Sequence, residues 1–326
     1  MLPNVDWLSH LFALMPVRGS LDIRCSFGAP WALSHDAVAK GEIPYHIVLK
    51  GEAVLEDSAG LGKTRLMAGD ILLLPGGEAH NLHDGSGQRA KPVVRRDGIN
   101  VVINENSGTG EQFDMLCGSF FLESPYDRVL LRYLPERLIV RAGIQTESRG
   151  NNTTDSRLAN LVALMRAEAD GECLGGRAML NACSVALFTL VLRLASESEN
   201  APMGLLALAG HPRLAPALGA MLDDPARAWT LPELADICNM SRATLVRHFQ
   251  ERLGHSANDF LLDIRMTLAA KELEKSNIST GAVADLAGYQ SEAAFQRAFK
   301  KHMGVTPAQW RRDSAVRVVR TNGGSP

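Results

Sequence analysis

The order of hydrophobic and polar residues changes character twice along the chain. Up to about residue 145, short apolar runs alternate with clusters of glycine, proline, aspartate and asparagine, such as Pro75-Gly76-Gly77. Apolar runs of this length and spacing predict the strands of a small all-β barrel or sandwich. The runs cover residues 45–55, 71–74, 99–103 and 113–122.

From about residue 155 to 222, apolar residues recur every three or four positions, which predicts helices. One stripe runs from Leu158 to Met165 and a second from Met179 to Leu194, with three glycines between them. We expect an antiparallel helix pair, preceded by a polar linker over residues 146–154. The second stripe is wide. It could pack wholly within the chain or partly against another subunit, and the pattern leaves both open.

Between residues 223 and 313 the pattern predicts short helices, with capping boxes at Thr230-x-x-Glu233 and Thr306-Pro307-x-Gln309. Here one arrangement occurs twice, over residues 234–249 and 283–299. Each copy has an alanine where two helices would cross, then a residue that tolerates positive φ, then a second helix with apolar anchors. The copies are 49 residues apart. A predicted helix over 256–276, about 30 Å long, joins them.

This arrangement predicts two helix-turn-helix units, spaced to reach successive major grooves roughly 34 Å apart. The outward side chains of the second helices could contact base edges or phosphates. They could also be ordinary solvated charges, and Glu292 could accept from a cytosine amine or complement a helix N-terminus. The candidates are Arg242, Thr244, Arg247 and Gln250 in the first copy, and Glu292, Gln296, Arg297, Lys300 and Lys301 in the second.

The last third of the chain resembles the DNA-binding domain of the AraC/XylS family of transcription regulators. The resemblance rests on the spacing of Gly288, Tyr289, Ser291, Phe295, Phe299, Lys300, Gly304, Thr306, Pro307, Trp310 and Arg311. Trp310 and Gln290 are mild departures from the family pattern. The resemblance implies a sequence-specific DNA-binding regulator whose two reading helices carry the candidate residues.

The β-rich zone resembles the cupin sensor domain that is often fused to such a DNA-binding domain. Residues 69–80 fit the second cupin motif, and residues 45–52 stand at the place of the first. His46 and His80 are therefore candidate effector ligands. Since the first motif offers a single histidine, the metal-ligand set is incomplete. We predict no metal and no cofactor.

Cys25 and Cys117 are candidate redox sensors. Their placement resembles the branch of cupin-fused regulators that responds to reactive chlorine. Arg24 beside Cys25 would lower the pKa of the thiol and favour its oxidation. Two alternatives remain open: inert, buried cysteines with a small-molecule effector in the barrel, or a metal-dependent cupin enzyme with a DNA-binding tail. The sequence shows no paired carboxylates or nucleophile–base set, so we expect no enzymatic activity.

Charge at first argues against a nucleic-acid partner, because the 326 residues carry a net charge of -2. The net charge of the whole chain combines a basic region with an acidic one. Residues 225–320 contain 14 basic and 10 acidic side chains, whereas the remainder contains 20 and 26. Five cysteines without a C-x-x-C favour a reducing cytoplasm over a disulfide framework. No apolar run reaches the length of a membrane span.

Together these features predict an α+β multidomain protein. The expected parts are a cupin-like β-barrel over 1–145, a helical linker and dimerisation region over 146–222, an all-α double helix-turn-helix domain over 223–313, and a flexible tail over 314–326. The expected partners are double-stranded operator DNA, a second copy of the chain, a small-molecule effector or an oxidant, and RNA polymerase.

Overall fold

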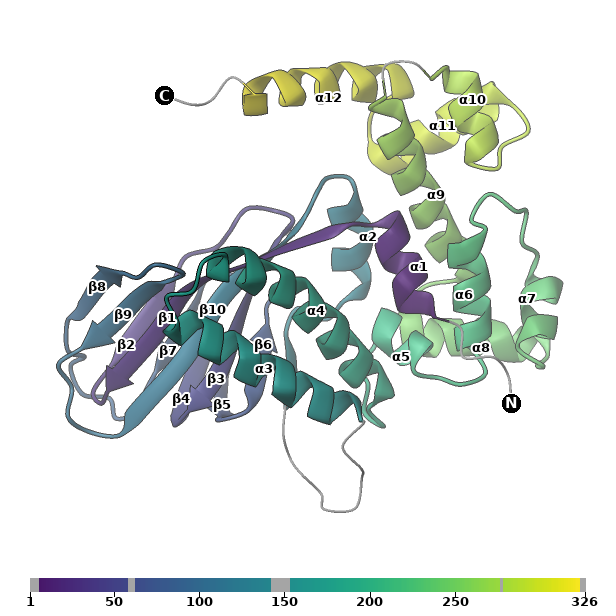
Figure 1. Ribbon diagram of the computed structural model, residues 1–326. Helices are drawn as coiled ribbons and strands as arrows, with labels where there is room; N and C mark the ends of the chain where they lie inside the picture. The colour runs from purple at the N-terminus through teal and green to yellow at the C-terminus, as the bar shows by residue number, and fades with distance from the viewer. Residues whose placement is uncertain (1–5, 58–61, 142–152, 276–277, 323–326) are drawn as a thin grey trace. The chain divides into compact units, whose positions relative to one another are not determined.

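The computed structural model describes residues 6–57, 62–141, 153–275 and 278–322 (Figure 1). The chain forms two compact units that alternate along the sequence. One unit contains Pro16–Glu123 and Leu134–Pro202. The other contains Met1–Met15, Ser124–Tyr133 and Met203–Pro326.

The first unit is built on two β-sheets. The larger sheet has the strand order β11-β6-β3-β10-β1-β9-β8, and the smaller has the order β2-β7-β4-β5. Neighbouring strands are antiparallel except for β1 and β9. The strands are β1 (Val17–Gly28), β2 (Ala32–His35), β3 (Glu42–Lys50), β4 (Glu52–Asp57), β5 (Lys63–Met67), β6 (Asp70–Leu73), β7 (His80–His83), β8 (Val93–Asp97), β9 (Val102–Asn106), β10 (Gln112–Leu122) and β11 (Leu138–Arg141).

Side chains from both sheets share one buried core, as expected of a barrel or sandwich. Phe27, Val48 and Met115 come from the larger sheet, and Leu55 and Leu82 from the smaller. The apolar run predicted as one strand over 45–55 is two strands. The chain reverses at Gly51, whose φ of 80° favours glycine.

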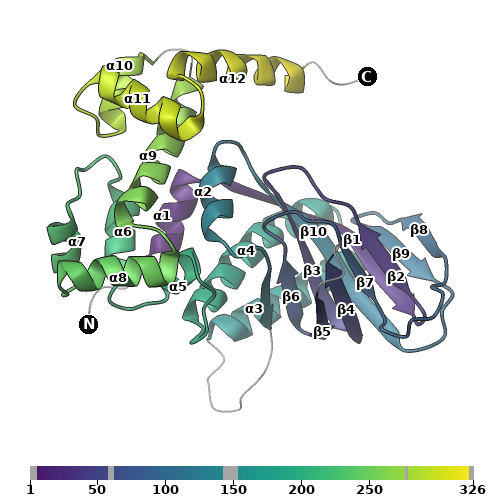
Figure 2. The ribbon, with the colours of Figure 1, turned by 180° about the vertical axis from the view of Figure 1, so that it is seen from behind.

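Helices α3 (Thr154–Asp170) and α4 (Gly176–Glu197) cover the other face of the larger sheet (Figures 1 and 2). The Tyr45 and Ser184 hydroxyls lie 2.8 Å apart, and Phe120 packs against Phe188. Most of the predicted wide stripe of α4, including Leu187, is therefore buried within this chain. The close contact between β1 and α4 requires a glycine at position 19, where a Cβ would lie 2.7 Å from the Ser184 Cβ.

By length and composition α4 could cross a membrane, with a mean hydropathy of 1.8 over its most apolar window. The prediction that no segment reaches this length was therefore wrong for residues 176–197. A core helix of a globular domain has the same composition, and one face of α4 packs on the sheet.

The second unit is helical. Its core around the second helix-turn-helix contains Val283, Phe295, Phe299 and Trp310. The helices are α1 (Trp7–Leu14), α2 (Tyr126–Tyr133), α5 (Leu205–Ala209), α6 (Ala215–Asp223), α7 (Leu231–Ile237), α8 (Arg242–Leu253), α9 (Ala257–Leu273), α10 (Thr280–Leu286), α11 (Glu292–Met303) and α12 (Pro307–Asn322).

The expected boundaries differ from these units in three places. Helices α3 and α4 belong with the sheets rather than to a separate region, because α4 packs on β1 and β10 and α3 packs on α4. Helices α1 and α2 belong with the helix-turn-helix units, where α1 packs on α6 and α2 on α9. Residues 314–322, expected to be a flexible tail, continue α12. The predicted linker lies mostly outside the described residues.

Candidate DNA interface and sensor site

Both predicted helix-turn-helix units have the local geometry that the sequence indicated. Asn239 and Gly288 both adopt positive φ, at 50° and 75°. Gly288 must also lack a side chain, because a Cβ there would lie 2.2 Å from the Ala226 carbonyl oxygen. Ser241 and Ser291 cap the second helices through their hydroxyls. The capping box at Thr230 is complete, whereas at Thr306 only the hydroxyl half forms and Gln309 bonds Asp313.

The outward faces of α8 and α11 carry the candidate residues. Over Ser241–Gln250 and Ser291–Lys300, buried and exposed positions follow the same order in both copies. Thr244 is half-buried, and the other candidates are exposed: Arg242, Arg247, Gln250, Glu292, Gln296, Arg297, Lys300 and Lys301.

Several of these side chains have partners within their own helix. Arg247 Nε lies 3.8 Å from Glu251 Oε1, an exposed pair that DNA could displace at little cost. Gln250 Nε2 donates to the Gly254 carbonyl oxygen at 3.1 Å, and Thr244 is bonded to the capping hydroxyl of Ser241. Glu292 accepts from Gln296 Nε2 at 2.8 Å. Arg247 therefore has to break only a weak, exposed ion pair to reach a base, whereas Gln250, Thr244 and Glu292 must give up hydrogen bonds.

Sequence reasoning missed an apolar position on this surface. Val246 lies between the candidates of α8 and is 46% exposed. Exposed methyl groups on a reading helix can contact the thymine methyl group. The helical period could have indicated Val246, because it follows Arg242 by four residues and therefore lies on the same face.

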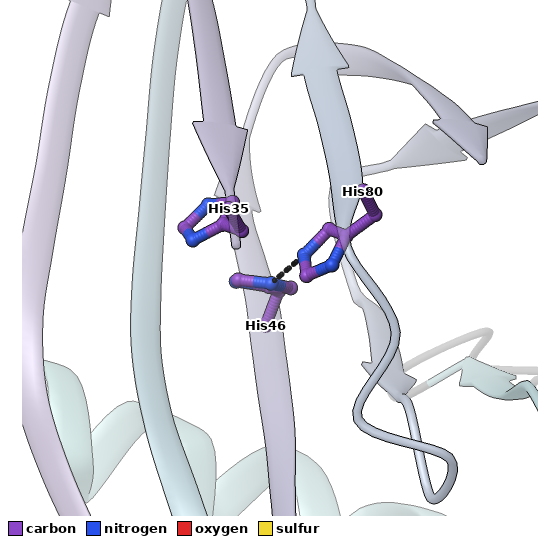
Figure 3. Close-up of side chains that lie close together, drawn as sticks. All are labelled: His35, His46 and His80. Carbon is purple, nitrogen blue, oxygen red and sulfur yellow. Dashed lines mark hydrogen bonds between the residues drawn. The ribbon is translucent and has the colours of Figure 1, made fainter. Parts of the chain in front are cut away.

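In the first unit, three histidines meet between the sheets (Figure 3). His46 on β3 pairs across the larger sheet with Cys117 on β10, and its Nδ1 lies 3.2 Å from the Cys117 Sγ. His35 on β2 pairs across the smaller sheet with His80 on β7, and their rings are stacked. The Nε2 atoms of His46 and His80 lie 2.8 Å apart and join the two sheets.

The hydrogen bonds of these rings have donors and acceptors that can be assigned, starting from His80. His80 Nδ1 lies 2.9 Å from the Glu78 carbonyl oxygen, which can only accept, so Nδ1 donates. In a neutral ring, His80 Nε2 then accepts from the Nε2–H of His46. His46 Nδ1 is left to accept from the Cys117 thiol.

Burial favours the neutral form of all three rings. Desolvation, reinforced by His80, lowers the pKa of His35 to about 4. It also lowers the pKa of His46 well below its usual value and lowers that of His80. At neutral pH each ring therefore offers a nitrogen lone pair.

Both predicted effector ligands, His46 and His80, line a cavity of about 270 Å³, together with Cys117 and Asp22. His35 also lines it and was missed. It lies outside both cupin motifs, and the register of β2 with β7 brings it there. No spacing in the sequence indicates that register.

The two candidate cysteines lie close together in the core. Cys25 on β1 is opposite Met115 on β10, two residues from Cys117. A hydrogen bond between the two thiols, together with burial, raises the pKa of Cys117 well above its usual value. The expected activation of Cys25 by Arg24 was wrong. Neighbouring strand residues point to opposite faces, and Arg24 pairs with Asp114 at 2.9 Å and with Asp170.

The comparisons with known proteins agree with both halves of this description. Residues 6–197 match the family described as Cupin, and residues 234–313 match the helix-turn-helix domain. An uncharacterized HTH-type transcriptional regulator of Haemophilus influenzae is 31% identical over 96% of this chain and 100% of its own length. The chain belongs to the AraC family of transcription regulators with an N-terminal cupin domain.

Two further relatives of this AraC-family regulator match over nearly their full length. The HTH-type transcriptional regulator MtrA of Neisseria gonorrhoeae is 29% identical over 95% of this chain and 99% of its own. The RCS-specific HTH-type transcriptional activator RclR of Escherichia coli is 29% identical over 94% of this chain and 97% of its own length. The predicted fold class and the predicted role as a DNA-binding regulator are confirmed.

Proposed function

We propose that this AraC-family regulator is switched when Cys25 and Cys117 are oxidised to a disulfide. The observation that supports the proposal is that the two buried thiols belong to one core cluster and lie on adjacent strands, two positions out of register. Cys117 also lines the cavity, which gives a small oxidant a route to one of the two sulfur atoms. The name of RclR, an RCS-specific activator, supports hypochlorous acid as the oxidant.

The reaction consumes one oxidant molecule for each disulfide. The Cys117 sulfur attacks the chlorine of hypochlorous acid, so the S–Cl bond forms while the O–Cl bond breaks. Hydroxide leaves and combines with the thiol proton, for which His46 Nδ1 is the neighbouring acceptor. The Cys25 sulfur then displaces chloride and loses its own proton. Two thiols and one hypochlorous acid yield one disulfide, water, chloride and a proton.

Reporter strains carrying Cys25→Ser or Cys117→Ser test this proposal. We expect both variants to lose the transcriptional response to hypochlorite, whereas Cys173→Ser, which removes an exposed thiol, should respond normally. Wild-type protein treated with hypochlorite should lose the mass of two hydrogen atoms, restored by dithiothreitol. An unchanged response in both variants would reject redox switching and favour the second candidate function.

The second candidate is a regulator switched by a small molecule in the cavity, with the cysteines inert. The cavity favours it, because about 270 Å³ lined by imidazoles and two carboxylates can hold a small polar ligand. In either case we propose that the cupin domain senses rather than catalyses, that the protein acts in the cytoplasm, and that its signal changes access of RNA polymerase to the promoter.

We also propose that the regulator is a homodimer that uses the outer side of α3 and α4. Packing on the sheet leaves Leu164 and Met179 more than two-fifths exposed, and Leu174 between the helices is fully exposed. Changing Leu174 and Met179 together to glutamate should weaken self-association at least about tenfold, measured by light scattering across a dilution series. Leu286→Glu, at an exposed leucine of the other unit, should have no effect. A double variant that remains dimeric would exclude this surface.

A further inference from the structure

We propose that the edge of strand β11 and the end of helix α4 form a groove that binds an extended, basic peptide segment of a partner protein. The segment would add to the larger sheet as a further strand. The proposal goes beyond the switch described above, because peptide binding requires neither DNA nor a signal in the barrel. All the residues that form the groove belong to the first unit, within Leu134–Pro202.

The groove follows the edge of the larger sheet. β11 is the terminal strand of that sheet and pairs only with β6 among the described strands. All four of its residues, Leu138–Arg141, line a cavity of about 580 Å³. Since neighbouring side chains of a strand point to opposite faces, a cavity lined by four residues in succession runs along the edge of the strand. The backbone groups of that edge are the ones to which an added strand bonds.

The last turns of α4 form a second wall of the groove, where Leu194 lies half-buried. Leu138 of β11 pairs with Leu73 of β6, which pairs in turn with Tyr45 of β3. The Tyr45 hydroxyl lies beside Ser184 of α4. Because cross-strand partners point to the same face of a sheet, every second side chain of an added strand would lie on the face that α4 covers. An apolar side chain there would pack on Leu194.

Charge complementarity indicates basic side chains on the peptide. Glu197 and Glu199 line the groove and are exposed. Glu197 Oε1 accepts from the uncharged Thr154 hydroxyl at 3.1 Å, and within the described ranges no lysine or arginine forms an ion pair with either carboxylate. Arg141 also lines the groove, but it is bonded to Asp70 at 2.7 Å, which compensates its charge. The groove therefore keeps two negative charges that a basic segment would complement.

A second copy of this chain fits the groove less well than a separate partner does. The exposed basic strand of the chain itself, β8, is the opposite end of the same sheet. Joining β8 of one copy to β11 of the next would link copies head to tail instead of closing a two-fold dimer. Basic residues on an edge strand, here Arg95 and Arg96, are a usual means of preventing such pairing. A segment of another protein would occupy the groove without this open-ended growth.

A synthetic peptide of sequence Arg-Thr-Val-Thr-Arg with blocked ends tests the groove in the full-length protein. Its arginines and valine share one face of an extended strand. Isothermal titration calorimetry should show saturable binding of one peptide per chain. Glu197→Lys combined with Glu199→Lys should weaken binding at least about tenfold. The matched control, Glu78→Lys combined with Glu111→Lys, makes the same change of charge at two exposed positions of the same unit and should bind like the wild type.

Two measurements separate strand addition from attraction between charges alone. The bound peptide should slow amide hydrogen exchange in β11 but not in β8, the other edge strand of the same sheet. Successive residues of a strand present their N–H groups to opposite edges. A peptide N-methylated at both threonines and one N-methylated at the arginines and valine are therefore blocked on different edges, and only one of the two should fail to bind.

The proposal is overturned if the wild type shows no saturable binding, or if the charge-reversed variant binds the peptide as tightly as the wild type does. Equal binding of the two N-methylated peptides would also overturn it, in favour of a small organic cation held by charge. A peptide that converts dimers into monomers would assign the groove to contact between copies of this chain and would overturn the assignment to a separate partner.

Discussion

Replacing Asp263 with alanine should lower the free energy of unfolding of the helical unit by about 1–3 kcal/mol. The Asp263 side chain is only 4% exposed and joins three helices. Arg132 and Tyr133 of α2 both bond its carboxylate, the former at 3.0 Å, and His302 of α11 lies 3.1 Å away. Alanine would leave the buried Tyr133 hydroxyl without its acceptor, whereas the half-exposed Arg132 would be solvated by water. Urea unfolding followed by circular dichroism measures the change.

Asp285→Ala is the matched control, because that carboxylate is exposed on α10. A surface substitution of this kind changes stability by less than about 0.5 kcal/mol. Asp263→Asn, which keeps the size and part of the hydrogen bonding, should fall between the two. A loss below about 1 kcal/mol for Asp263→Ala would show that the buried carboxylate does not hold α2, α9 and α11 together.

Arg247→Ala and Arg297→Ala should each weaken binding to the specific operator by about 1–3 kcal/mol. The two arginines occupy equivalent exposed positions, the sixth residue of α8 and of α11. A bidentate contact from either to a guanine would be lost with the guanidinium. Gel-shift titrations at fixed salt measure the effect, and each variant should lose discrimination at a different base of the operator.

Lys275→Ala separates base reading from loss of charge. It also removes one positive charge from an exposed residue, but Lys275 lies beyond the end of α9 and pairs with Glu272. Its operator affinity should stay within about twofold of the wild type. If both arginine variants bind the operator as tightly as the wild type does, the reading surface has been assigned to the wrong side chains.

The helix-turn-helix units could be predicted from sequence because their determinants are local. A positive φ at Asn239 and Gly288, serine caps and apolar anchors all act within about twenty residues, and the pattern occurs twice. The β-strands were also indicated by period and turn residues. The turn at Gly51, which divides one predicted strand in two, was not recognised.

The candidate sensor site depends on contacts between distant segments, which the spacing of residues does not encode. Cys117 meets His46 across 71 residues, and His35 meets His80 through the pairing of two short strands. Arg24 shows the opposite error, since adjacency in sequence suggested a contact that strand geometry forbids. Motifs identified two of the three histidines, and only the fold supplied the third.

The alternation of the two units along the chain limits how this regulator can exchange parts with others. Helices α1 and α2 precede the double helix-turn-helix in sequence yet pack on α6 and α9. A recombination event that transferred residues 203–326 alone would leave α1 and α2 behind and expose the surfaces of α6 and α9 on which they pack. New pairings of sensor and DNA-binding domain would therefore survive only when three separate gene segments remain compatible, which favours inheritance of this protein as a whole.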